Sequence, residues 1–510
     1  MEQVFKLSIP PNLHLIQENA YQVRKQFVDI QQVSLPSELS IIVICYNNLE
    51  KTQNCINSIL ENTKHFDFEL ILMDNGSDDG TIDYLNHIPY PKKRIIASPQ
   101  NIGLDFLLAH ITPDMLGRYV VKICNDVIVT PRWLDNLFAC LNSDEKIGLV
   151  TPMFSNAMGL QGINLCSAGA DYAAVQAAGE EYNHSDPRKW QERLILVDPL
   201  AFYRKEALLA AGFPIFDVAY LHGNESDLAF RIRRNGYKII LAGDTWVQHD
   251  HDYAQPNEGR QSSGLGISAN DPNYAINTFS NRWDGVKLFD DVYNFWSNYC
   301  KSMPISEGLN LFRILGIDVK CGQPILDIKN YLRQGGKTDV LCYAFTQEER
   351  YMPDLRTVCG PENAYCDREE FFRDYFPAEI FDCVVIDRPI NQYKEPIKVY
   401  RDVLACLKKG GILLLSLLNT QTYVDFLSMA VDKGTASNIS AVYLPVERFA
   451  SAIINDVEIL NVFSQIDTLE PQELLMHALD GLCKPEQHQE LVTRMLSKKY
   501  IFMLKKKQKG

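Results

Sequence analysis

Three short polar runs contain the residue types that could bind a charged ligand. They are Cys45-Tyr46-Asn47-Asn48, the segment from Asp74 to Gly80, and Asn125-Asp126. Each run directly follows an apolar stretch with the length of a buried strand. Asn, Asp and Gly after a strand often only form the turn and cap the next helix, so one such run alone is weak evidence. The three together favour a binding site.

The elements that would position these runs form a repeated pattern of strand, turn and helix. The predicted strands are LSIIVICY, FELILMD, RIIAS, YVVKIC and IGLVTP, at residues 39–46, 68–74, 94–98, 119–124 and 147–152. Because these runs are apolar on both faces, they indicate a parallel sheet covered on both sides. In an open sheet of this kind, ligands bind beyond the carboxyl ends of the strands, where the polar runs lie. The pattern predicts a doubly wound α/β fold.

The pattern restarts after Pro304. It contains a helix-like stretch at residues 325–332, then the strands DVLCYAF and FDCVVID, the helix PIKVYRDVLACLKKGG and the strand ILLLSLLN. The late runs EILNVFSQID and KYIFMLKK are expected to close this sheet as an antiparallel pair. We therefore expect a helical amino-terminal extension over residues 1–37, one α/β domain over 38–303 and a second, Rossmann-like α/β domain over 304–510.

Six stretches of the first domain occur in a recognisable order between residues 39 and about 300. They are LSIIVICYNN, ELILMDNGSDDGT, QNIG, KICNDVIVTPRWLDNLF, GNESDLAFRIRRNGYK and TWVQH. Together they resemble the inverting glycosyltransferases of family two, which have the GT-A fold. The resemblance implies transfer of a sugar from a nucleoside-diphosphate-sugar donor of the UDP or dTDP type. The acceptor would be a glycan, a lipid-linked molecule or a protein.

The chemistry of such a donor predicts a divalent cation, Mn²⁺ or Mg²⁺. A diphosphate leaving group carries concentrated negative charge, and this chain has no GxxxxGK[ST] loop to hold it. A cation can act there as a Lewis acid. Both cations bind carboxylate oxygen and Mn²⁺ also accepts imidazole, so Asp126 and His249 are the candidate ligands. The alternatives are a helix-capping role for Asp126 and a structural role for His249.

The metal motif departs from the family pattern. The usual D-x-D sequence reads Cys124-Asn125-Asp126, so the first carboxylate is absent. Three neighbours of His249 could compensate, namely Asp250, His251 and Asp252, but their spacing does not decide this.

Asp74 is the leading candidate for the nucleotide base, because a carboxylate at a strand end can accept a hydrogen bond from a base N–H. The resemblance implies the same role. Tyr46 offers a ring to pack on the base, and Asn101 offers an amide to the phosphate or the sugar. Cys45 and Asn125 complete the expected nucleotide-sugar site. The alternative for the turn residues is that they only build the turn.

Inversion requires a base on the face opposite the leaving group, to take the proton of the acceptor. In GNESDLAFR, Glu225 occupies the position where the family carries its catalytic Asp, and Asp227 follows two residues later. Asp227 is the second choice, because an acidic residue in the first turn of a helix is also explained by the helix dipole. Arg231 could hold either carboxylate in place.

The segment FDCVVIDRPINQYKEPIKVYRDVLACLKKGGILLLSLLN resembles the second half of class I S-adenosylmethionine-dependent methyltransferases. That fold needs a glycine turn after its first strand so that the cofactor can approach the backbone closely. The strand DVLCYAF is instead followed by Thr346-Gln347-Glu348-Glu349-Arg350. We therefore expect a domain without cofactor that serves packing, acceptor docking or homodimer contacts. A bifunctional enzyme and a non-catalytic nucleotide-sugar-binding scaffold are the alternatives.

The bulk composition limits the partners. With 50 Lys and Arg against 64 Asp and Glu, the net charge of −14 argues against nucleic acid. The thirteen cysteines include no CxxC pair, which favours reduced thiols. Without an apolar run long enough for a membrane helix, the chain is expected to be cytoplasmic. The lysines of residues 498–509 could contact anionic lipid at the inner face of the membrane, although a solvated tail is the simpler interpretation.

Overall fold

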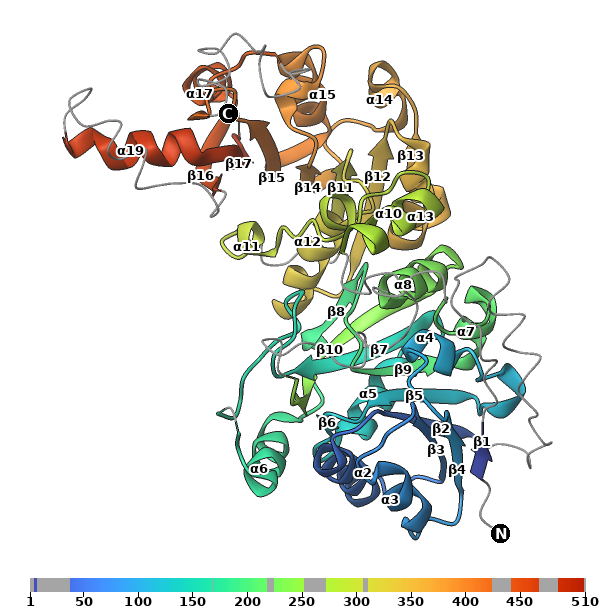
Figure 1. Ribbon diagram of the computed structural model, residues 1–510. Helices are drawn as coiled ribbons and strands as arrows, with labels where there is room; N and C mark the ends of the chain where they lie inside the picture. The colour runs from blue at the N-terminus through green and yellow to red at the C-terminus, as the bar shows by residue number, and fades with distance from the viewer. Residues whose placement is uncertain are drawn as a thin grey trace. The chain divides into compact units, whose positions relative to one another are not determined.

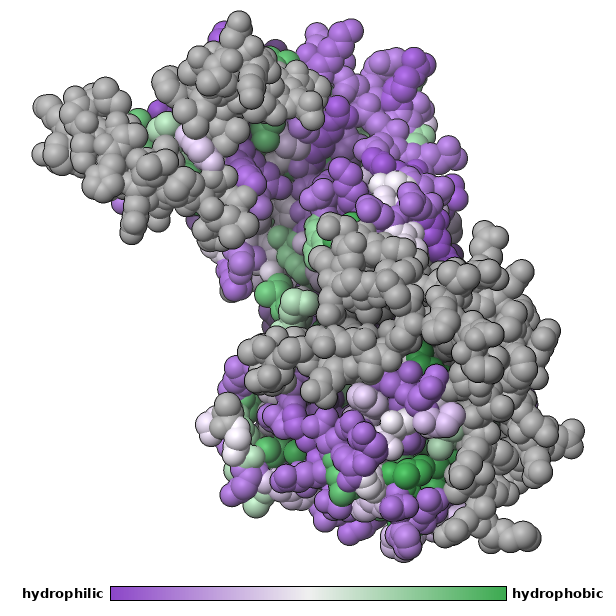
Figure 2. Space-filling model, viewed as in Figure 1, coloured by the Kyte–Doolittle hydropathy of each residue, from purple (hydrophilic) through white to green (hydrophobic). Residues whose placement is uncertain are grey.

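The computed structural model describes residues 4–6, 37–167, 169–217, 224–251, 272–305, 311–423, 442–466 and 485–508. The chain divides into two compact α/β units, Met1–Tyr293 and Asn294–Gly510, each with its own mixed sheet (Figure 1). The first unit runs from blue to green and the second from yellow to red. Hydrophilic side chains cover most of the described surface in the view of Figure 2, as expected when the apolar strand residues lie inside.

The first unit is built on a 10-stranded sheet of order β1-β4-β3-β2-β5-β9-β7-β10-β6, with β8 paired to β10. The strands from β1 to β5 in this order are mutually parallel, whereas β9 is antiparallel to β5 and β7. The strand bounds are β1 Val4–Lys6, β2 Leu39–Cys45, β3 Phe68–Asp74, β4 Lys93–Ala97, β5 Tyr119–Cys124, β6 Val127–Ile128, β7 Ile147–Phe154, β8 Trp190–Arg193, β9 Leu200–Arg204 and β10 Lys238–His249.

Helices of the first unit follow the strands as the apolar spacing predicts. In α2, Thr52, Cys55, Ile56 and Ile59 recur at helical spacing and are all buried. They join one continuous core with the strand residues of the sheet. The helix bounds are α2 Leu49–Asn62, α3 Thr81–His87, α4 Leu104–Leu108, α5 Trp133–Leu141, α6 Tyr172–Tyr182, α7 Lys205–Ala211, α8 Asn224–Arg234 and α10 Pro272–Arg282, with short turns at η1 Pro113–Met115, η2 Pro187–Lys189 and η3 Leu288–Val292.

The second unit contains a 7-stranded sheet of order β13-β12-β11-β14-β15-β17-β16. The strands β11 to β15 are parallel, and β17 is antiparallel to both of its neighbours. The strand bounds are β11 Phe312–Ile317, β12 Val340–Thr346, β13 Ala364–Cys366, β14 Phe381–Ile386, β15 Leu407–Leu418, β16 Val457–Ile466 and β17 Ser497–Lys506. The helix bounds are α11 Ser297–Cys300, α12 Gln323–Gln334, α13 Met352–Cys359, α14 Phe372–Tyr375, α15 Pro396–Cys406, α17 Val446–Ile453 and α19 Pro485–Leu496, with turns η4 Glu349–Tyr351, η5 Pro361–Asn363, η6 Glu369–Phe371 and η7 Ile390–Gln392.

The doubly wound α/β fold is confirmed, including the antiparallel pair of β16 and β17. One expectation for the second unit was wrong. DVLCYAF is not its first strand, because β11 precedes it and lies between β12 and β14 in the sheet. The turn after β11 contains a glycine, Gly322, with a φ of 101°. A glycine turn therefore does follow the first strand of the second unit, contrary to the expectation.

The described residues near the two ends of the chain differ from the expected helical extension and solvated tail. Within residues 1–37, the structure describes a strand, β1, which pairs in parallel with β4, and residue 37. The remainder of the expected helical extension lies outside the described residues. Near the other end, the chain itself contacts three lysines of the basic run: Lys506 Nζ donates to Leu407 O at 2.6 Å, Lys507 Nζ donates to Ile454 O at 2.7 Å, and Lys499 is half-buried.

Candidate functional site

Two neighbouring strands, β2 and β3, end side by side at the carboxyl edge of the first sheet. Their last residues, Cys45 and Asp74, are register partners, and the amide of Asn75 donates to Cys45 O at 2.9 Å. Burial raises the pKa of the Cys45 thiol, and the charges of Cys55 and Asp74 act in the same direction. Cys45 therefore contributes a neutral, buried side chain beside Asp74.

The two carboxylate oxygens of Asp74 differ in their hydrogen bonding. Its Oδ2 accepts hydrogen bonds from the amides of Gly76, at 3.2 Å, and Ser77, at 3.1 Å. Its Oδ1 is buried and accepts no hydrogen bond from the described residues. Burial raises the pKa of Asp74, although the hydrogen bonds from Ser77 and Gly76 oppose the shift. A buried acceptor without a donor costs free energy, so a ligand N–H at this point would be stabilising.

The turns after β2, β3 and β5 are tied together by polar contacts. Asn125 Nδ2 donates to Asn47 O at 3.0 Å and to Thr52 Oγ1 at 2.8 Å. The amide of Asn47 donates in turn to Ser77 Oγ at 2.9 Å. Asn125 therefore fixes the end of β5 against the turn that follows β2. Tyr46 stands in that turn and is half-buried.

Asn101 is part of the turn after β4. Its Oδ1 accepts from Asn75 Nδ2 at 3.0 Å and from the amide of Gly103 at 2.9 Å. The neighbouring turn comes so close that a Cβ on Gly76, whose φ is 80°, would lie 2.3 Å from the carbonyl carbon of Gln100. The side-chain oxygen of Asn101 thus holds the ends of β3 and β4 together.

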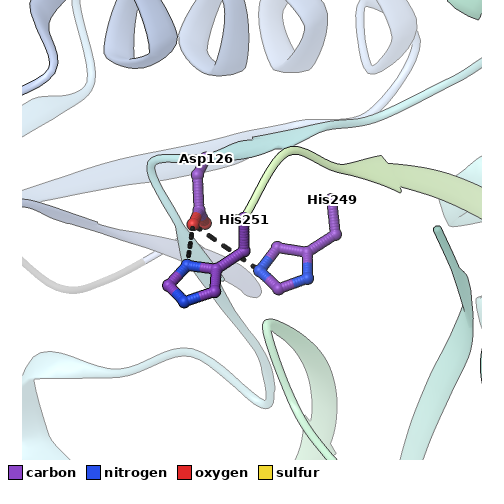
Figure 3. A group of neighbouring side chains, drawn as sticks. All are labelled: Asp126, His249 and His251. Atoms are coloured by element: carbon purple, nitrogen blue, oxygen red, sulfur yellow. Dashed lines mark hydrogen bonds and ion pairs between the residues drawn. The ribbon is translucent and has the colours of Figure 1, made fainter. Parts of the chain in front are cut away.

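Three possible metal ligands meet at the other end of this edge (Figure 3). Oδ2 of Asp126 lies 3.5 Å from His249 Nε2 and 3.2 Å from His251 Nδ1. The two imidazole rings are stacked, with centroids 5.5 Å apart and planes 10° apart. One ligand atom from each residue lies within 4.8 Å of the other two. The structure brings the predicted pair together and adds His251, which the sequence indicated only as a neighbour.

The backbone fixes this group. His249 and Val127 are antiparallel register partners of β10 and β6, and the amide of Asp250 donates to Asp126 O at 2.8 Å. Ser155 Oγ accepts from the amide of His249 at 2.8 Å and donates to its carbonyl at 3.0 Å. Asp250 itself forms an ion pair with Lys51 at 3.1 Å, and Asp252 lies outside the described residues.

The electrostatics of Asp126 favour its charged form. Burial opposes ionisation, but the hydrogen bonds and charges of His249 and His251 outweigh it and hold the pKa of Asp126 well below its ordinary value. Its Oδ1 is buried and accepts no hydrogen bond from the described residues. The exposed fraction of the side chain rises from 7% in His249 to 19% in Asp126 and 30% in His251, so the group is open on the side of His251.

Glu225 and Asp227 lie in the first turn of α8, in different surroundings. Glu225 is half-buried, whereas Asp227 is fully buried. Oδ2 of Asp227 accepts from Arg231 Nε at 2.8 Å, and its Oδ1 accepts from Trp283 Nε1 at 3.2 Å. Arg282 adds an ion pair at 3.5 Å. Both oxygens of Asp227 are thus engaged by the protein, which is the arrangement of a structural carboxylate.

A buried charged pair that the sequence pattern did not indicate lies in the electrostatic environment of Glu225. Lys122 Nζ, on β5, donates to Asp198 Oδ1 at 2.9 Å, and Tyr203 OH donates to Oδ2 of the same carboxylate at 2.9 Å. Burial raises the pKa of Asp198 to about 6; the charge of Glu225 adds to the shift, while Lys122 opposes it. The charge of Glu225 also contributes, after burial, to the raised pKa of Tyr293. A lysine inside the apolar run YVVKIC was the available signal.

Part of the first unit matches a known protein family. Residues 40–208 match glycosyl transferase family 2. The family 2 match begins in β2 and ends in α7, so it includes Asp74, Asn125 and Asp126. Glu225 and His249 lie beyond it. This stretch of the chain is therefore similar to glycosyl transferase family 2.

A relative by sequence is an uncharacterised glycosyltransferase of Haemophilus influenzae, which is 29% identical over 111 residues. The aligned part is 21% of this chain and 34% of that protein. The aligned part of the chain thus spans about a third of the length of this relative.

Three solved structures show weak overall likeness. GalNAc-T7 with UDP, GalNAc and Mn²⁺ has a TM-score of 0.33 and 13% identity, over 49% of this chain and 54% of its own. The mannosyltransferase PcManGT from Pyrobaculum calidifontis, in complex with GDP-Man and Mn²⁺, has a TM-score of 0.30 and 20% identity, over 46% and 64%. A putative sarcosine dimethylglycine methyltransferase from Galdieria sulphuraria has a TM-score of 0.30 and 11% identity, over 46% and 98%. Because these TM-scores are low, the ligands bound in those structures are not assigned to this chain.

Among the helices that the structure describes, none has the length and apolar character needed to cross a membrane.

Proposed function

We propose that the first unit is an inverting glycosyltransferase that moves a sugar from a nucleoside-diphosphate donor to a hydroxyl of its acceptor. The observation that carries the proposal is the pairing of Asp126 with His249, 3.5 Å apart, at the sheet edge where Asp74 presents an open oxygen. One end of this edge suits the base of a nucleotide, and the other suits its diphosphate with a cation.

The open Oδ1 of Asp74 is the acceptor for the base N–H of the donor. An N–H donor flanked by carbonyls is present in uracil and thymine, so a UDP-sugar or a dTDP-sugar is the expected donor. Tyr46, half-buried in the adjacent turn, is placed to pack on the base. Asn125 and Asn101 shape the turns through their side-chain contacts, and in this proposal they support the site rather than recognise the nucleotide.

Asp126 and His249 are the proposed protein ligands of a divalent cation, Mn²⁺ or Mg²⁺. The residues fit a cation because Oδ1 of Asp126 is buried without a donor while both histidines face Oδ2. When bound, the cation would supply Lewis-acid stabilisation of the leaving diphosphate.

Glu225 is the proposed general base. Its carboxylate takes the proton of the acceptor hydroxyl while that oxygen bonds to the anomeric carbon and the nucleoside diphosphate leaves from the opposite face. Asp227 is the less suitable candidate, because Arg231 and Trp283 occupy its two oxygens. The buried Lys122–Asp198 pair lies in the electrostatic environment of Glu225.

The test is the anomeric configuration of the product. The purified full chain is incubated with an α-linked UDP-sugar or dTDP-sugar, Mn²⁺ and a panel of glycan, lipid-linked and peptide acceptors, and the product is examined by proton NMR. A β-linked product is expected. An α-linked product would contradict inversion and the role of Glu225.

The remaining proposals concern partners. A cytoplasmic location with contact to anionic lipid through the late lysines has little support from the structure, since Lys506 and Lys507 donate to the chain itself. Homodimer formation is a further proposal.

A second candidate function is a non-catalytic scaffold that binds a nucleotide sugar. It is favoured by one observation, the Cys at position 124 in place of the first metal carboxylate.

A further inference from the structure

The three-residue group at the metal site differs from a set of carboxylates in one chemical respect. Two of its three potential ligands are nitrogen atoms, Nε2 of His249 and Nδ1 of His251, and both face the same oxygen of Asp126. The stacked rings leave Oδ1 of that carboxylate buried and without a hydrogen bond from the described residues.

A purely structural role explains this arrangement less well. One histidine would be enough to pair with Oδ2, and a second imidazole stacked on the first at 5.5 Å adds a group that must also be desolvated. The surface pair of His65 and Asp135, joined at 2.8 Å, shows the simpler case in the same domain. Two imidazoles and one carboxylate are instead a donor set suited to a transition-series dication.

We propose that His251 is the third protein ligand of the cation and replaces the carboxylate that is missing at Cys124. The set of Asp126, His249 and His251 then selects Mn²⁺ or Co²⁺ over Mg²⁺, since Mg²⁺ prefers oxygen and keeps its water. This inference rests on the proposed function only for what the cation does in the reaction. The affinity for the cation itself is measured with no sugar donor present.

The experiment is a calorimetric titration of the full chain with MnCl₂, CoCl₂ and MgCl₂, with no nucleotide present. One site is expected, with Mn²⁺ and Co²⁺ bound at least about tenfold more tightly than Mg²⁺. His251→Gln offers an amide oxygen in place of imidazole, so it should weaken Mn²⁺ and Co²⁺ at least about tenfold and narrow the preference over Mg²⁺. The matched control, His65→Gln, should change neither value.

A second readout identifies the ligand atoms. The electron paramagnetic resonance of bound Mn²⁺ should show coupling to two imidazole nitrogens in the wild type and to one in His251→Gln. Equal affinity for Mg²⁺ and Mn²⁺, or an unchanged nitrogen coupling in the variant, would overturn the inference. Metal binding with no nucleotide-sugar binding would leave it standing and refute the proposed function.

A different observation, in the second unit, carries a second inference. In an open α/β sheet, ligands bind beyond the carboxyl ends of the strands where the strand order reverses, which here is between β11 and β14. The side chain of Trp296 lies beside the carboxyl end of β14 and is 1% exposed. Its Nε1 donates to Asp387 Oδ1, directly after β14, at 3.1 Å, and its amide donates to Asp327 Oδ2, on α12, at 2.5 Å.

Neighbouring side chains also contact Trp296 and the acidic residues at these strand ends. Asn294 Nδ2 donates to the second oxygen of Asp387 at 2.7 Å, and Lys499 Nζ lies 5.8 Å from the centroid of the Trp296 ring. In the turn after β11, Asp318 accepts from the amide of Gln347 at 3.0 Å and from Tyr393 OH at 2.7 Å. Asp318 and Asp387, the acidic residues directly after β11 and β14, are therefore both engaged by the chain itself.

We infer that Trp296 fills the place of a planar ligand ring and that the second unit binds no adenosyl cofactor. Titration of the full chain with S-adenosylhomocysteine should give no heat of binding. Trp296→Gly should lower the melting temperature, and millimolar indole should raise it again, because the vacated space keeps Asp387 as an acceptor for the indole N–H. Phe449→Ala, which opens a buried space of another shape, is the matched control and should respond less to indole.

Micromolar binding of S-adenosylhomocysteine to the wild type would overturn this inference, whether or not the variant folds. A folded Trp296→Gly protein that indole does not stabilise would also overturn it.

Discussion

Nε2 of His249, the last residue of β10, lies 3.5 Å from Oδ2 of Asp126, which stands between β5 and β6. The two side chains come from segments far apart in the chain, and the antiparallel pairing of β6 with β10 brings them together. Because a cation held here would also contact the donor diphosphate, metal binding and donor binding are expected to be coupled.

Asp126→Ala should therefore weaken Mn²⁺ binding and UDP binding together, each by at least about tenfold when Mn²⁺ is present. Calorimetry with MnCl₂ alone, and with UDP in the presence and absence of Mn²⁺, measures both. Asp135→Ala removes an exposed carboxylate that also pairs with a histidine, and it should change neither affinity. If a chelator leaves the activity of the wild type unchanged, the metal assignment is wrong.

Asp74→Asn should separate stability from binding. Burial raises the pKa of Asp74 in the folded protein, so its ionisation destabilises the fold as the pH rises through and above the ordinary carboxyl range. The variant should melt at a higher temperature than the wild type at pH 7, and the difference should shrink toward acidic pH. Its UDP affinity should fall, because the new amide can offer a donor in place of the acceptor Oδ1. Unchanged UDP affinity would remove Asp74 from the nucleotide site.

Glu225→Gln should lower kcat by about 10² or more while nucleotide binding is retained, because the amide cannot take a proton. Asp227→Asn is the matched variant. It should lower the melting temperature, since it weakens a buried ion pair with Arg231. Steady-state kinetics, UDP titration and thermal unfolding of both variants distinguish the roles. Near-normal turnover in Glu225→Gln would transfer the catalytic role elsewhere.

A fragment of residues 1–293 should fold and bind UDP with Mn²⁺. One apolar core of the first unit consists of residues between Leu39 and Val247, and one core of the second consists of residues between Leu315 and Leu504. Each unit thus has its own core, as an independent domain requires. Thermal unfolding and UDP titration of the fragment are the measurements, and Asp126→Ala within it is the control. A fragment that does not unfold cooperatively would show that the first unit needs the second.

The strand ends of the first unit could be predicted because short stretches of sequence are enough to identify them. Apolar runs such as FELILMD are buried along their full length, and the polar residue that follows a parallel strand is carried to one edge of the sheet by the fold alone. Asp126 and His249 could be paired in this way. Whether His251 joins them depends on how the chain leaves β10, and spacing does not determine that.

Other features depend on contacts that sequence does not display. Lys122 sits in the middle of an apolar strand, and its partner Asp198 becomes visible only when β5 and β9 pair. The strand FRILGI was missed because it contains Arg313 and Gly316, although it lies inside its sheet between β12 and β14. The place of Trp296 follows from tertiary packing around Asp387, which no local pattern encodes.

Glycosyl transfer from a nucleotide sugar is tested most directly by release of free nucleoside diphosphate. The purified full chain is incubated with UDP-sugars and dTDP-sugars and Mn²⁺, without acceptor, and the liberated UDP or dTDP is measured over time. We predict slow release from at least one donor, and we expect a chelator or Asp126→Ala to abolish it. Absence of both release and binding for every donor would contradict it.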